Sequence, residues 1–144
     1  MRIVVQRVVE STVSVDNAIV GSIDKGLMIL VGITRGDSRE NIEYLVNKLV
    51  NLRIFDDNDG IMNKSIIDVD GKILSISQFT LYADTSKGNR PSYANALKSE
   101  EAVFLYNLFN DELRKHVSVA EGVFGADMKV SLTNDGPVTI ILER

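Results

Sequence analysis

The sequence predicts a mixed α/β fold in about three layers, with sheet packed on sheet and two main helices covering one side. Strand and helix patterns follow one another in the order strands, helix, strands, helix, strands. Two helices are too few to cover both faces of a sheet, so a second layer of strands is expected. The chain has 144 residues, of which 44% are hydrophobic and 25% charged, so residues 1–144 are expected to form a single domain.

The first third of the chain carries strand patterns. Residues 2–9 are dense in Val and Ile, and residues 12–15 and 19–23 flank an Asp-Asn pair that favours a hairpin turn. Residues 26–33 form a continuous apolar run, which is typical of a strand buried on both faces.

Two segments have helical periodicity. The first helix is expected to begin at Asp37, with Glu40 three residues on completing a capping box. The second helix is expected over residues 99–114, with Ser99 as its N-cap. In the first helix, one face carries apolar residues at helical spacing, namely Ile42, Leu45, Val46, Leu49 and Val50. The corresponding residues of the second helix are Ala102, Leu105, Tyr106, Phe109 and Leu113.

The remaining segments predict loops and further strands. Residues 56–60 are an acidic, solvated turn, because the ligand positions of a calcium loop do not fit them. Residues 66–69 and 72–80 flank an Asp-Gly pair and are expected to form a hairpin. Residues 128–133 alternate strictly between apolar and polar, as in a half-buried strand, and residues 138–142 form the last strand.

The composition excludes several classes of function. The net charge of −4 excludes a polycationic nucleic-acid binder but allows a local basic patch. The absence of cysteine excludes disulfides, cysteine-ligated metals and thiol nucleophiles. His116 is the only histidine, which excludes sites with two histidine ligands, and a structural role after the second helix is expected for it. No apolar run is long enough to span a membrane and no signal peptide is recognised, so we expect a cytoplasmic protein. We expect no metal and no cofactor.

Residues 77–93 are the first candidate for chemistry. A strand ends in Ser77-Gln78 and is followed by hydroxyls, an amide, a glycine and two cations, Lys87 and Arg90. Loops at the ends of buried strands often carry binding sites, and both cations are suited to phosphate. A polar surface loop without function accounts for the same residues equally well.

Residues 134–139 are the second candidate. Their Asp-Gly pair is typical of a hairpin turn between two strands. Pro137 fits that turn poorly, because it removes a backbone donor at the start of the next strand. A cis Gly136–Pro137 bond would instead present a rigid pair of backbone carbonyls, and the residues alone leave both interpretations open.

Together, six segments of the chain resemble the D-aminoacyl-tRNA deacylase family over essentially the whole length. Their order, spacing and the total length all match, and the segments are residues 5–8 (VQRV), 26–32 (GLMILVG), 77–81 (SQFTL), 87–92 (KGNRPS), 122–128 (GVFGADM) and 134–139 (NDGPVT).

The resemblance implies an editing hydrolase. Such enzymes cleave the ester between a D-amino acid and the terminal adenosine of tRNA, remove mischarged glycine and spare L-aminoacyl-tRNA. It also implies a homodimer with active sites at the interface, which binds the acceptor end of tRNA and involves neither membrane nor DNA. The low net charge confines the expected tRNA contact to that end, so we expect modest and strongly salt-dependent affinity.

The resemblance also implies roles for individual residues. Gly136 and Pro137, joined by a cis bond, would reach into the partner's pocket and exclude an L side chain, as a steric block that needs no affinity for the D side chain. Arg7 is expected behind this loop, fixing its orientation. The residues expected at the ester and the adenosine are Ser77, Gln78, Phe79 and Thr80. Asn134 is expected to help bind substrate, Lys87 and Arg90 to contact tRNA phosphates, and the pocket to be lined by Phe124, Ala126 and Met128, for which a plain core role is the alternative.

Catalysis in this family is assisted by the 2′-hydroxyl of the tRNA, and the chain has no Ser-His-Asp or Cys-His set that would replace it. Backbone N–H groups near Gln78 and Phe79 are the expected oxyanion donors. One alternative is an esterase that uses Thr80 as nucleophile. Another is a module that binds the tRNA end without catalysis.

Overall fold

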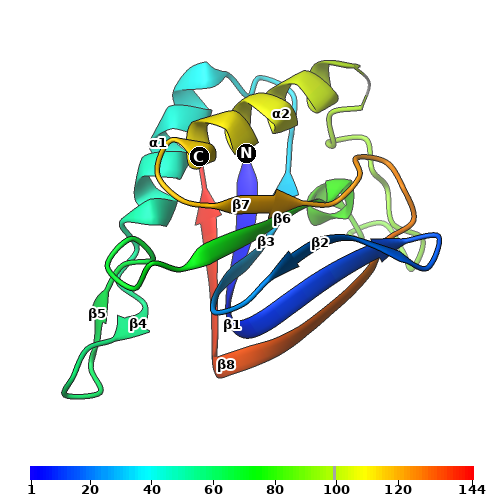
Figure 1. Cartoon of the computed structure of the whole chain (residues 1–144). Helices are drawn as coiled ribbons and strands as arrows, with labels where there is room; N and C mark the ends of the chain where they lie inside the picture. Colours follow the sequence, from blue (N-terminus) through cyan, green and yellow to red (C-terminus); the bar gives the residue numbers. More distant parts are fainter. Residues whose placement is uncertain (99) are drawn as a thin grey trace.

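One strongly curled, six-stranded mixed sheet forms the body of the computed structural model, which describes residues 1–98 and 100–144 (Figure 1). Its strand order is β2-β1-β3-β6-β7, and β8 pairs with the other edge of β1. The strands of this sheet are β1 (Arg2–Val15), β2 (Ala18–Ile23), β3 (Gly26–Gly32), β6 (Lys72–Ser77), β7 (Val119–Glu121) and β8 (Lys129–Glu143). The other elements are the helices α1 (Arg39–Val50) and α2 (Glu100–Arg114), the 3-10 helix η1 (Phe79–Tyr82) and a small hairpin of β4 (Phe55–Asp56) and β5 (Met62–Lys64).

The predicted strand over residues 26–33 is confirmed as β3 at the centre of the sheet. It pairs antiparallel with β1 and parallel with β6, and both of its faces are covered. The parallel pairings β3–β6 and β6–β7 are each connected through a segment that contains a helix, α1 and α2 respectively. Both helices therefore lie over the same face of the sheet (Figure 1).

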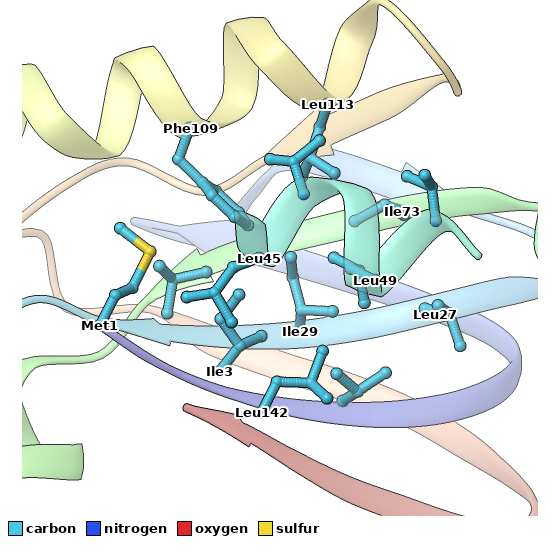
Figure 2. Close-up of a cluster of buried hydrophobic side chains, with 14 of the residues drawn as sticks. Met1, Ile3, Leu27, Ile29, Leu45, Leu49, Ile73, Phe109, Leu113 and Leu142 are labelled. Carbon is cyan, nitrogen blue, oxygen red and sulfur yellow. The ribbon is translucent and has the colours of Figure 1, made fainter. Parts of the chain in front are cut away.

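The two helices and the sheet enclose the main hydrophobic core. Figure 2 shows Leu45 and Leu49 of α1 and Phe109 and Leu113 of α2 pointing toward strand residues such as Ile29. All five side chains have an exposed fraction of 0%. The apolar stripes predicted for the two helices are confirmed as the surfaces that they bury.

A second core lies inside the curl of the sheet. Gly21 of β2 packs so closely on β6 and β7 that a Cβ there would lie 2.9 Å from the Glu121 carbonyl oxygen and 3.1 Å from the Leu74 side chain. The buried residues of this core are Val8, Val13, Ile23, Met28, Leu74 and Ile76. The predicted mixed α/β architecture is confirmed, and one curled sheet supplies both of its strand layers.

Five local predictions were wrong. Residues 2–9 and 12–15 are one strand, β1, and residues 128–133 and 138–142 are likewise one strand, β8. Residues 66–70 form a turn instead of the first arm of a hairpin, because β6 pairs with β3 and β7. The strand predicted over residues 72–80 ends at Ser77, and residues 79–80 lie in η1. The fifth concerns the start of α1.

Ser38 caps α1 in place of Asp37. The Ser38 backbone N–H and hydroxyl donate to Asn41 Oδ1 at 3.0 and 2.8 Å, so Asn41 fills the capping-box position expected for a glutamate. The Asp37 carboxylate instead accepts the Thr34 N–H at 2.8 Å and pairs with the amino group of Met1. The cap predicted at Ser99 lies outside the described residues.

The acidic segment 56–60 belongs to the β4–β5 hairpin. Asp57 Oδ1 accepts the N–H groups of Ile61 at 3.1 Å and Asp59 at 3.0 Å. These backbone hydrogen bonds hold the pKa of the Asp57 carboxyl below its usual value. The carboxylate thus organises its own turn, as the sequence interpretation of a solvated turn expects.

Candidate active site

A cavity of about 600 Å³ opens where β6 passes into η1. Its wall comes from the ends of β3 and β6, from residues 93–98 and from the segment after β7, and these segments gather at one end of the sheet in Figure 1. The lining residues that had been predicted as site residues are Ser77, Gln78, Phe79, Phe124, Ala126 and Met128.

Residues 77–80 reach the cavity because the sheet ends there. The Gln78 N–H donates to the Val31 carbonyl at 2.8 Å, which extends the β3–β6 pairing by one residue before the chain turns into η1. This N–H is therefore used by the sheet, and of the donors expected near Gln78 and Phe79 it is not a free one in this chain. The Gln78 side-chain amide is hydrogen-bonded to the Thr80 hydroxyl.

The first N–H groups of η1 are the free donors at this position. A helical turn leaves its first N–H groups without carbonyl partners. Within residues 1–98 and 100–144, the N–H groups of Phe79 and Thr80 donate to no carbonyl, whereas that of Leu81 bonds Gln78 at 3.3 Å. Two adjacent backbone donors are thus available, on Phe79, which lines the cavity, and on Thr80, which follows it in the chain.

Thr80 has no base beside it. Across the described residues, its hydroxyl has only the Gln78 amide as a side-chain partner, and Thr80 does not line the cavity. His116 lies after α2, where its N–H donates to Leu113 at 2.9 Å, and it lines a separate cavity of about 150 Å³. A hydroxyl nucleophile needs a neighbouring base, so the arrangement does not activate Thr80.

Aromatic rings shape two sides of the cavity. Phe79 meets Tyr93 edge to face, with ring centroids 5.0 Å apart, and Phe124 lies 5.6 Å from the ring of Tyr106. The Tyr106 hydroxyl donates to the Ser75 carbonyl at 2.9 Å, and burial raises the pKa of this phenol. Tyr106 therefore stays neutral and supports Phe124 from behind.

The sequence interpretation assigned no role to Tyr93, Lys98 or Asp127, which also line the cavity. An aromatic residue and two charges spread over 35 positions form no recognisable spacing. Only the folded chain brings them together.

The segment around Gly136 forms a bulge within β8 and not a hairpin turn. Asn134 pairs with Val8 and Thr139 pairs with Gln6, so four residues of β8 stand opposite Arg7 alone. The hairpin interpretation is therefore wrong. The Gly136–Pro137 peptide bond is cis.

Arg7 lies directly behind this bulge with an exposed fraction of 5%. Its Nε donates to the Asp135 carbonyl at 3.1 Å, and its Nη1 donates to the Ile54 carbonyl at 2.7 Å. The carboxylates of Asp56 and Asp135 lie 3.2 and 3.3 Å from the guanidinium. A Cβ on Gly136 would lie 3.3 Å from Arg7 Nη2, so the loop rests on the guanidinium.

Within one chain, the residues predicted to contact the aminoacyl end fall into two groups, and Thr80, Lys87 and Arg90, which do not line the cavity, belong to neither. Those at the cavity come from residues 77–79 and 124–128, whereas Arg7, Asn134, Gly136 and Pro137 do not line it. Asn134, Gly136 and Pro137 are exposed on the surface. Because the first group lines one cavity, the described chain supports it as a site. The second group does not line that cavity.

Lys87 and Arg90 lie on an exposed loop between η1 and Tyr93. Backbone hydrogen bonds of 2.8 and 2.9 Å between Asp84 and Ser92 close the neck of this loop. The Ser86 N–H donates to Asp84 at 2.9 Å and holds the pKa of that carboxyl below its usual value. Both cations therefore sit beside the cavity segments without lining the cavity.

No group of three or more acidic, histidine or cysteine side chains in the described part of the chain is arranged to hold a metal ion. In the same residues, neither α1 nor α2 has the length and apolar character of a transmembrane helix.

Comparisons with known proteins agree with the fold and identify the family. A solved structure named c-Myc DNA Unwinding Element Binding Protein is 41% identical over 100% of this chain and 99% of its own, with a TM-score of 0.95. Another, a probable eukaryotic D-amino acid tRNA deacylase, is 17% identical and shares the fold, with a TM-score of 0.83 over 98% of this chain and 97% of its own. The family model for D-Tyr-tRNA(Tyr) deacylase matches residues 4–143. The chain therefore belongs to the D-Tyr-tRNA(Tyr) deacylase family of ester hydrolases.

Proposed function

We propose that this protein cleaves the ester that links a D-amino acid, or glycine, to the terminal adenosine of tRNA, and that it spares L-aminoacyl-tRNA. The observation that carries the proposal is the pair of free N–H groups on Phe79 and Thr80 beside the cavity, in a chain of this family. The products are free tRNA and the amino acid.

The reaction needs an oxyanion site and an activated water. Water adds to the ester carbonyl carbon and gives up a proton, and the carbonyl oxygen becomes negative. The C–O bond to the ribose then breaks as the ribose oxygen takes up a proton. Donors aimed at the developing negative charge contribute strongly to such reactions. We assign this role to the N–H groups of Phe79 and Thr80, and we assign the activation of water to the adjacent 2′-hydroxyl of the tRNA.

Chiral selection is assigned to Gly136 and Pro137 of a partner subunit. The separation of these residues from the cavity of their own chain favours a role across an interface. The buried guanidinium of Arg7 gives the loop a rigid support, and a block must be held more finely than the width of a methyl group. Glycine carries no side chain to be blocked, so cleavage of glycyl-tRNA follows from the same arrangement.

The deciding experiment compares the deacylation of matched D-aminoacyl-tRNA, L-aminoacyl-tRNA and glycyl-tRNA. We expect cleavage of the D and glycyl substrates, with the L substrate at least about 100-fold slower, which corresponds to about 2.8 kcal/mol. Tight binding of the tRNA end without cleavage of any substrate would favour the non-catalytic module. Loss of activity in Thr80→Ala, with full activity of the wild type on a small D-amino-acid ester, would favour the threonine esterase.

The same assay should include duplex DNA as a competitor, because one similar structure is named for DNA binding. We expect duplex DNA at matched phosphate concentration to leave the deacylation rate unchanged, since the net charge of −4 favours contact with the tRNA end alone. Strong competition by DNA would contradict the expected absence of a DNA partner. A cytoplasmic location stays a prediction.

A substitution on the outer face of β8 tests the proposed homodimer. Within the described chain, β8 pairs only with β1, and Ile141 on its outer face is 63% exposed. We expect Ile141→Glu to convert a dimer into a monomer, as measured by light scattering, and to abolish the preference for D over L substrate. Ile67→Glu, at a turn residue that is 46% exposed, is the matched control. A monomeric variant that still rejects the L substrate would refute selection across the interface.

A further inference from the structure

The turn η1 is seated on the backbone of β3. Gly32 ends β3, and a Cβ there would lie 3.0 Å from the Leu81 Cβ and 3.3 Å from the Gln78 carbonyl oxygen. The side of η1 that faces β3 therefore has no room to shift inward.

Arg2 of β1 holds the C-terminal half of η1. Its Nη1 donates to the Leu81 carbonyl oxygen at 2.7 Å, and its Nε and Nη2 donate to Glu143 Oε1 at 3.2 and 2.7 Å. The guanidinium also lies 5.0 Å from the centroid of the Tyr82 ring. One planar side chain thus joins β1, β8 and η1.

We propose that Arg2 is a positioning residue for the hydrolysis, because it fixes the turn that carries the Phe79 and Thr80 N–H groups. This inference rests on the proposed function. Arg2 does not line the cavity, so it acts through the Leu81 carbonyl and not by contact with the substrate.

The neighbouring groups support a fixed orientation for this guanidinium. Glu143 receives two N–H groups of Arg2, which leaves Nη1 directed at Leu81. Burial raises the pKa of Tyr82 to about 12, so the ring against the guanidinium stays a neutral phenol. An arginine fork can bond a carboxylate and a carbonyl at once, whereas a lysine ammonium acts as a single point charge.

The test compares Arg2→Ala and Arg2→Lys with wild type on D-aminoacyl-tRNA. We expect Arg2→Ala to lower kcat by at least about tenfold, because small displacements of catalytic donors have large effects. We expect KM to change by less than about twofold, since ground-state binding is not touched. Arg2→Lys should recover part of the loss. The matched control is Lys72→Ala, which removes an exposed ion pair of 3.0 Å with Asp24 elsewhere on the sheet.

A second readout needs no substrate. The N–H of Leu81 bonds Gln78 at 3.3 Å and that of Ala83 bonds Thr80 at 3.0 Å, so their hydrogen exchange followed by NMR reports on η1 directly. We expect faster exchange at both amides in Arg2→Ala and unchanged exchange in Lys72→Ala.

The outcomes separate this inference from the proposed function. A wild-type protein that cleaves none of the substrates contradicts the proposed function, and the exchange rates then decide alone whether Arg2 holds η1. Unchanged exchange in Arg2→Ala overturns the inference. Faster exchange with unchanged kcat also overturns it, because η1 would then be loosened without any effect on the reaction.

Discussion

Arg7→Lys is expected to lower the preference for D over L substrate by at least about tenfold and to lower the free energy of unfolding by about 1–3 kcal/mol. The Arg7 guanidinium donates hydrogen bonds to the Ile54 carbonyl, the Asp135 carbonyl and the Asp56 carboxylate at the same time. A lysine ammonium cannot reproduce this planar set of bonds, so the bulge that carries Gly136 loses its support. Selectivity is measured from the rates on matched D- and L-aminoacyl-tRNA, and stability by urea denaturation.

Arg53→Lys is the control for this variant. Arg53 is exposed and donates to the Asn63 carbonyl at 3.0 Å, so the same substitution there removes a single surface hydrogen bond. We expect it to leave selectivity unchanged. If Arg7→Lys lost stability but kept full rejection of the L substrate, the orientation of the Gly136 bulge would not depend on Arg7.

Gly26→Ala is expected to destabilise the fold by about 3 kcal/mol or more. A Cβ on Gly26 would lie 1.9 Å from the Lys72 carbonyl oxygen and 2.7 Å from the Lys72 nitrogen. Both atoms belong to the backbone of β6, so the clash is relieved only by separating β3 from β6. The urea midpoint, or the soluble yield if the variant does not fold, measures the effect.

Gly36→Ala serves as the matched substitution. Nothing lies within 4 Å of a Cβ at Gly36, and only its φ of +89° opposes a side chain. We expect this variant to lose about 1–2 kcal/mol, as is typical of the left-handed region. Equal losses in the two variants would show that the close approach of β3 and β6 has no special cost.

Sequence and structure agree where a feature depends on residues close together in the chain, and they differ where it depends on residues distant in sequence. The Asp16-Asn17 turn has φ values of 49° and 65°, as a tight hairpin turn requires, and its two residue types alone predict it. The Asp70-Gly71 pair carries the same local signal, with a φ of 50° at Asp70, but no hairpin follows it. The difference lies in the partners of β6, which are β3 and β7, both distant in sequence.

The same difference separates the site residues that the local sequence identifies from those that depend on distant contacts. Residues 77–79 could be singled out because one short segment carries the end of a buried strand and a change to polar residues. The use of the Gln78 N–H by Val31 could not be predicted, since it depends on the register between β3 and β6. Tyr93 and Lys98 reach the same cavity from the segment before α2 and Asp127 from the segment after β7, and the three share no spacing.

The sequence by itself determined the apolar faces of both helices, the fully buried central strand and the segments that resemble the family, because each depends on residues close together in the chain. Only the tertiary structure decided that one sheet curls to form two layers, that β8 bulges opposite Arg7, and that the Gln78 N–H is taken by Val31 while those of Phe79 and Thr80 donate to no carbonyl in the described residues. These features depend on strand register and on contacts between distant segments. A one-residue shift in register would redirect every such side chain and N–H group, so local patterns do not specify them.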